Sequence, residues 1–160
     1  GYYQGNGFDS TELRDLRFAL LLLYAEQGEF VLEGRKILFD GQMLLCMNEQ
    51  ESLYVSENVQ VKGIIFHPSV INGAFDFDNI RTQSESFDIT QQQDHYFLMA
   101  FMRREKENDA ILFPSLDAIE RIAFLMECFQ EQITKQENSF LIKLYILWIS
   151  KKLKKLITAI

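Results

Sequence analysis

Proline, histidine and cysteine are scarce in this chain, and each shortage excludes a class of protein. Only two prolines and eight glycines occur among 160 residues, which argues against a linker or a low-complexity segment. The two histidines, His67 and His95, do not form a His-x-His pair, so the usual metal site of paired imidazoles inside a barrel is excluded. No glycine-rich phosphate loop is present. We therefore expect no bound metal and no other cofactor.

The two cysteines and the apolar runs predict a protein of the cytoplasm. Cys46 and Cys128 lie inside apolar runs without neighbours of metal-ligand type, and free cysteines of this kind are usually buried. Unpaired thiols fit a reducing compartment. The longest nearly apolar stretch, residues 140–149, contains Lys143 and is too short to cross a bilayer. No signal peptide is visible, so we expect a cytoplasmic protein without membrane contact.

Positive charge is also in short supply. Sixteen Lys and Arg stand against 23 Asp and Glu, which gives a formal net charge of −7 at pH 7. The balance is uneven, because residues 1–110 carry 9 basic and 18 acidic side chains while residues 111–160 carry 7 and 5. An acidic protein repels phosphates, so we expect this chain by itself not to bind DNA.

Residues 17–67 are predicted to form short antiparallel strands. The apolar runs of this region are separated by turn residues and cover residues 18–24, 28–32, 35–39, 43–47, 52–55 and 59–67. The expected turns are Glu33 with Gly34, Asp40 with Gly41, and Glu57 with Asn58. Asp-Gly is a favoured pair for a two-residue hairpin because both turn positions require positive φ. Strands spaced so regularly predict an antiparallel sandwich or a small barrel.

Three helices are predicted to follow the strands. They cover residues 90–106, 116–136 and 139–160. Thr90 and Gln93 have the spacing of a capping box at the start of the first helix, and Ser115 can cap the second. The third helix ends in a group of lysines, as the C-terminal end of a helix prefers. The intervening residues 69–89 are expected to be irregular.

Three local patterns carry a resemblance to one protein family. They are residues 28–32 with Gly34, Leu38 and Gly41, residues 63–71, and Phe113 with Pro114 ahead of residues 116–119. The first is similar to the early barrel hairpins of that family, the second to the strand that leaves the barrel, and the third to the start of the penultimate helix. Over about residues 17–157, the chain resembles the regulatory domain of the AraC/XylS transcription regulators of bacteria.

The resemblance implies an α+β fold in which a cupin-like antiparallel barrel is followed by C-terminal helices. We expect the barrel and a connecting loop to occupy residues 1–89, and a helical dimerisation segment to occupy residues 90–160 of the same structural unit. The family implies a small-molecule effector in the barrel and a homodimer built by the helices. It also implies a helix-turn-helix domain that reads DNA. We expect that domain to be absent from this chain, so that any contact with DNA would be made by the absent domain.

Two other functions stay open beside effector sensing and dimerisation. One is a dimerisation scaffold that binds no ligand and has no catalytic role. The other is an enzyme with a cupin fold, which the sequence disfavours. No Ser or Cys nucleophile has an adjacent base, and no G-x-S-x-G signature occurs. We therefore expect a protein that is not an enzyme.

The candidate ligand contacts are apolar residues of the strands and polar residues at strand ends. They are Phe30, Arg35, Leu45, Met47 and His67. If the barrel has a cavity, its apolar lining suits an apolar or aromatic effector, and Arg17 with Arg35 could orient an acidic or hydroxylated group. Core filling is the alternative for the apolar residues. Packing or hydrogen bonding at the rim is the alternative for Arg35 and His67.

The last two helices carry apolar residues at alternating spacings of three and four, which is typical of helix-on-helix packing. The candidate dimer contacts on these seams are Phe129, Ile133, Ile142, Ile146 and Ile149. Packing of the two helices on each other within one chain would use the same residues. The third helix has a second apolar face, which a partner subunit, the barrel or the neighbouring helix could cover. That face consists of Leu141, Leu144, Tyr145 and Trp148.

Overall fold

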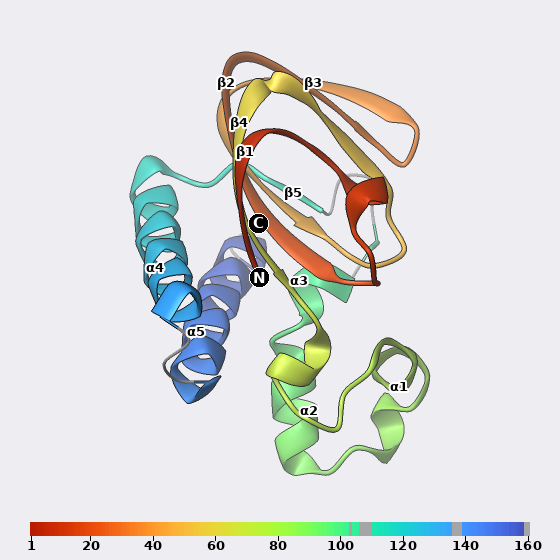
Figure 1. Ribbon diagram of the computed structural model, residues 1–160. Coiled ribbons are helices and arrows are strands. Elements are labelled where there is room, and N and C mark those ends of the chain that lie inside the picture. Colours follow the sequence, from red (N-terminus) through yellow and green to blue (C-terminus); the bar gives the residue numbers. More distant parts are fainter. Residues whose placement is uncertain (103, 106–109, 136–138, 159–160) are drawn as a thin grey trace.

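A computed structural model describes residues 1–102, 104–105, 110–135 and 139–158. The chain is α+β, with an antiparallel sheet of five strands in the order β1-β4-β2-β3-β5 followed by C-terminal helices (Figure 1). The strands are β1 (Tyr2–Asp9), β2 (Phe18–Leu32), β3 (Arg35–Met47), β4 (Leu53–Phe66) and β5 (Ile111–Leu112). The α-helices are α1 (Phe77–Thr82), α2 (Ile89–Tyr96), α3 (Met99–Met102), α4 (Leu116–Lys135) and α5 (Ser139–Thr158).

The strands are longer than the sequence predicted. Each of β2, β3 and β4 joins two of the expected short strands into one. The turn at Glu33 and Gly34 is confirmed, with φ of 50° and 77°. The turns expected at Asp40 with Gly41 and at Glu57 with Asn58 are wrong, because these residues lie inside β3 and β4. β1, which precedes the predicted region, was not predicted.

The three long ladders are irregular at the same level. The register shifts after Asn6 in β1 and after Ala25 in β2, opposite Gly41 of β3. Gly7 and Gly41 have φ of 73° and 77° there, a conformation that glycine adopts without strain. Bulges of this kind bend strands and increase their twist. The strands curve over at this level, and the sheet folds into two layers (Figure 1).

The inner face of the folded sheet is covered by the sheet itself. The buried residues between its layers come from all four long strands, together with Ala110: Phe8, Ala19, Leu21, Leu23, Ala25, Phe30, Leu32, Phe39, Met43, Leu45, Met47, Leu53, Val55, Val59 and Val61. The closed barrel that the sequence predicted is wrong, because the sheet is open and β1 and β5 are its edges. Bending brings the two layers of the sheet face to face. The apolar inner face is therefore buried although the edge strands β1 and β5 do not pair with each other.

The outer face of the sheet packs against the helices. Phe18 is central to this second cluster, and its ring centroid lies 5.6 Å, 5.0 Å and 5.2 Å from those of Phe66, Phe77 and Phe101. α4 and α5 pack on each other beside the sheet, and α1 and α2 lie beyond its end (Figure 1). Two apolar cores therefore share one sheet, one on each face.

The last two helices begin where the sequence predicted, and the first one does not. α4 starts at Leu116, and Ser115 accepts a hydrogen bond from the backbone of Ala118 through its hydroxyl (3.3 Å). The capping box expected at Thr90 is wrong, because Asp88 and Gln91 form it two residues earlier. The predicted helix over 90–106 is also divided into α2 and α3. Within the described part of the chain, no helix has the length and apolar character needed to cross a membrane.

Candidate functional site

Three of the predicted ligand contacts lie in the inner core. Phe30, Leu45 and Met47 are buried between the layers of the sheet, where they pack against the side chains of the opposite layer. This placement is the core-filling alternative that the sequence left open. Their role as ligand contacts stays a prediction, and it would require the two layers to separate.

The two polar candidates lie at strand ends. Arg35 is the first residue of β3, beside the β2–β3 turn, and its backbone pairs with Leu32. His67 follows β4 and caps the short 3-10 helix at Pro68–Val70, where its Nδ1 accepts from the backbone N–H of Ser69 (3.1 Å). Burial lowers the pKa of His67, and the positive charge of Arg17 lowers this pKa further. His67 thus has a structural role as a cap.

A hollow of about 510 Å³ with a mixed polar and apolar lining lies at the end of the sheet. It is bounded by the segment that joins β1 to β2 and by the turn that joins β3 to β4. The lining residues are Ser10, Thr11, Leu13, Arg14, Asp15, Leu16, Arg17, Met47, Asn48, Glu49, Gln50, Glu51 and Ser52. Of the predicted ligand contacts, Met47 borders this hollow.

The turn that forms one wall of the hollow is held by its own side chains. Asn48 is only 3% exposed, and its Oδ1 accepts from the backbone N–H of Gln50 (2.9 Å). The backbone N–H of Asn48 donates to Glu51 Oε1 (2.9 Å). From the other wall, Ser10 Oγ accepts from the N–H of Leu53 (2.9 Å). These bonds fix the turn relative to both walls.

Two carboxylates of the same turn bind arginines from distant parts of the chain. Glu49, with a side chain 3% exposed, accepts from Nε of Arg81 on α1 and from its Nη2 (2.9 Å). Glu51 accepts from Nε (3.1 Å) and Nη2 (2.8 Å) of Arg104, which follows α3. Both pairs are bidentate, the stronger geometry for an arginine and a carboxylate. The turn is therefore clamped to the helical region at two points.

The sequence offered no signal for these clamps. Glu49 and Arg81 are 32 residues apart, and Glu51 and Arg104 are 53 apart. Each residue alone reads as a charged residue of a loop or helix, which is most often solvated. Their pairing depends on the tertiary fold.

Arg17 provides positive charge at the hollow. Its guanidinium lies 3.5 Å from the carboxylate of Asp15, and its Nη1 donates to the carbonyl of Leu16 (2.6 Å). Asp15 is 72% exposed, so water screens this ion pair. Burial lowers the pKa of the amino group of Gly1, and Arg17 lowers it as well. Like His67, Gly1 thus experiences the charge of Arg17.

The predicted dimer contacts pack within the chain. Phe129, Ile146 and Ile149 are buried in the outer core, and Ile133 and Ile142 are partly buried against it. This is the packing alternative that the sequence left open, and it leaves Phe129, Ile146 and Ile149 inaccessible to a partner subunit in this arrangement. A partner would have to bind another face of the helices.

The second apolar face of α5 is partly covered. Leu141, Leu144 and Tyr145 are half-buried, and Trp148 is 48% exposed. The rings of Tyr145 and Trp148 contact each other edge to face, with centroids 5.6 Å apart. Along the same helix, Lys143 lies within the apolar half, and the group of four lysines begins at Lys151. The apolar face therefore covers the first half of α5.

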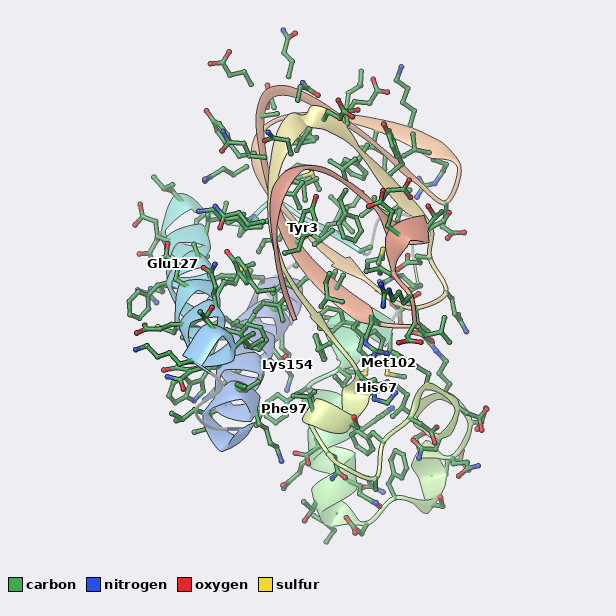
Figure 2. All side chains as sticks on the ribbon, viewed as in Figure 1. Tyr3, His67, Phe97, Met102, Glu127 and Lys154 are labelled. Carbon is green, nitrogen blue, oxygen red and sulfur yellow. The ribbon has the colours of Figure 1, made fainter. Side chains whose placement is uncertain are left out.

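The basic half of α5 contacts the helical region at the end of the sheet. Nζ of Lys154 lies 3.3 Å from the centroid of the Tyr96 ring, the last residue of α2. Lys154 and Phe97 mark this junction in Figure 2. A cation over an aromatic face is attracted by the ring quadrupole. The contact joins α5 to α2.

The described residues show no grouping that would serve metal or thiol chemistry. Among them, no cluster of three or more His, Cys, Asp or Glu could hold a metal ion. Cys46 is buried, as predicted, whereas Cys128 is half-buried. Burial raises the pKa of the Cys46 thiol to about 12, so it stays protonated at neutral pH and is a poor nucleophile.

Comparisons with the models of known protein families and with curated proteins find no match. The features of the described chain that could bind another molecule are the hollow, with the clamped turn beside it, and the partly covered face of α5.

Proposed function

We propose that this chain is the regulatory domain of a transcription regulator of the AraC/XylS type. In this proposal the folded sheet is a cupin-like body, the helices form a homodimer, and a small effector changes the arrangement. A helix-turn-helix domain outside the chain would receive the signal and bind DNA in the cytoplasm. The order of a bent antiparallel sheet followed by a helical hairpin supports the proposal.

The partly covered apolar face of α5 is the observation that carries the proposal. Large apolar side chains that stay in water forgo about 1.5–3 kcal/mol each relative to full burial. Trp148 and Leu144 are incompletely covered within the chain. A second copy related by a two-fold axis would place the same face of its α5 on this one. We expect the interface to end where the group of four lysines begins, at Lys151.

Sedimentation velocity of the 160-residue chain tests this assignment. We expect a dimer at micromolar concentration, and Leu144→Asp combined with Trp148→Asp should weaken it at least tenfold. Phe124→Asp is the matched control, because Phe124 is 64% exposed on α4. A monomer at every concentration would refute the proposal. A dimer that is lost in the control and kept in the double variant would move the interface to α4.

A dimerisation scaffold without a ligand is the second candidate. The observation that favours it is the inner core, in which the side chains of the two layers fill the place expected for an effector. In the sensor, an effector has to bind outside that core. Saturating ligand that changes the dimer dissociation constant would favour the sensor, because coupling between two sites is reciprocal.

A further inference from the structure

The hollow at the end of the sheet has the size of a small-molecule site. Its volume of about 510 Å³ lies within the ~300–1,000 Å³ typical of such sites. The register of β2 and β3 pairs Ala19 with Met47. If this pairing is continued by one or two residues beyond the strands, Arg17 lies beside the turn that begins at Asn48. Arg17 precedes β2, Asn48 follows β3, and both border the same hollow.

Asn48 presents a hydrogen-bond donor that the described part of the chain does not use. Its Oδ1 accepts from Gln50, whereas its Nδ2 donates no hydrogen bond to any described residue. Asn48 is 3% exposed and lines the hollow. Its Nδ2 is reached by solvent there, because the one buried side-chain polar atom without a partner in the described part of the chain is Gln132 Oε1. An oxygen of a bound ligand can accept a hydrogen bond from this Nδ2.

The charges of the lining favour an anion. Glu49 and Glu51 are neutralised by their bidentate arginines, so the carboxylate left in the lining is that of Asp15, which is largely exposed. The lining also contains two positively charged residues, Arg14 and Arg17. The lining also contains apolar side chains, Leu13 and Met47. The set therefore combines two cations and an amide donor with a small apolar wall.

The two hollows at the bend of the sheet have the opposite character. One is lined by Glu26 and the other by Glu29 and Asp40, and both include Gln27 and Asn58. No arginine or lysine is among their lining residues. An anion would be repelled from this region. The hollow at the sheet end is the one of the three that suits a carboxylate.

We infer that this hollow binds a small organic carboxylate, with Arg17 and the Nδ2 of Asn48 holding its oxygens and Leu13 and Met47 contacting its apolar part. The inference rests on the proposed function, since it names the site and chemical class of the effector. The clamps of Glu49 and Glu51 lie in the same turn. The ligand thus contacts the turn that holds α1 and the segment after α3.

Titration calorimetry of the full chain tests the site, with cyclohexanecarboxylate as the probe and cyclohexanecarboxamide as its neutral isostere. We expect the carboxylate to bind at least tenfold more tightly than the amide. Arg17→Gln and Asn48→Asp should each weaken carboxylate binding about tenfold or more, as expected for a lost hydrogen bond to a charged group. Asn48→Asp keeps the acceptor for Gln50, removes the donor and adds a negative charge that also repels the carboxylate.

Arg121→Gln is the matched control, because Arg121 is an exposed arginine paired with Asp117 on α4, away from the hollow. Circular dichroism melts of each variant verify that the fold is kept. Equal binding of acid and amide, unchanged binding in both hollow variants, or no heat with millimolar carboxylate would overturn the inference. Inorganic phosphate binding as tightly as the carboxylate would overturn the assignment of the apolar wall.

Sedimentation of the same samples separates this inference from the proposed function. Carboxylate binding by a chain that stays monomeric would overturn dimerisation and leave the site standing. A dimer that binds no carboxylate would overturn the site and leave dimerisation standing.

Discussion

The two faces of the sheet bury their apolar side chains in different ways. The inner face is covered by the sheet itself, because the strands bend at one level and place their two halves against each other. The outer face depends on helices that come from later parts of the chain. Those helices bring a second apolar face and two arginine clamps with them. The inner face therefore gives stability and borders the hollow through Leu13 and Met47, whereas the helical side offers the partly covered face of α5.

Phe30→Ala should have the largest effect, because it opens a cavity where no helix can move in to fill it. Phe30 is fully buried between the layers. Truncations of this kind cost about 3–5 kcal/mol in unfolding free energy. Urea denaturation followed by circular dichroism measures the change. Leu38→Ala, at a residue 71% exposed on β3, is the control and should stay within about 0.5 kcal/mol. Equal losses would show that the inner face is not a tight core.

Glu49→Gln should cause the next largest loss of stability. This loss should be concentrated in the helical region. Removing one partner of a buried ion pair costs about 3–5 kcal/mol, and the partial exposure of Arg81 reduces this to roughly 2 kcal/mol. Hydrogen exchange should show α1 losing protection before the sheet does. Glu131→Gln breaks an exposed pair with Lys135 and should cost much less, because water screens that pair. Uniform loss of protection would mean that the clamp does not act locally.

These two regions also differ in how far the sequence predicts them. α4 and α5 follow from apolar spacing within each helix, so local pattern was sufficient. The bend at Gly41 was mistaken for a hairpin, because Asp-Gly signals positive φ, which a turn and a bulge both require. The clamp between Glu49 and Arg81 leaves no local pattern at all. Ion pairs between residues that are distant in the sequence can be identified only from the tertiary structure.

Gly41→Ala should have a smaller effect, because the methyl group meets open space and only backbone strain remains. An L-residue in the left-handed region costs about 1–2 kcal/mol. Thermal melts should show this loss, and Gly41→Asn should recover part of it, since Asn tolerates that conformation. A loss as large as that of Phe30→Ala would mean that the bend cannot form without glycine, so that folding of both layers depends on it.

The contact between Lys154 and Tyr96 should have the smallest effect, although it joins α5 to α2. A cation near an aromatic ring contributes about 0.5–1 kcal/mol at exposed positions, and Tyr96 is 49% exposed. Lys154 also makes other interactions, so Lys154→Met alone would mix several effects. A double-mutant cycle with Tyr96→Leu isolates the pair, and we expect a coupling energy below about 1 kcal/mol. The cycle should be measured by denaturation and again by hydrogen exchange of α2. If coupling is found only in α2 exchange, the contact positions α2 without supporting the cores. Coupling of 2 kcal/mol or more in global unfolding would instead make α2 part of the outer core and remove the contrast between the two faces.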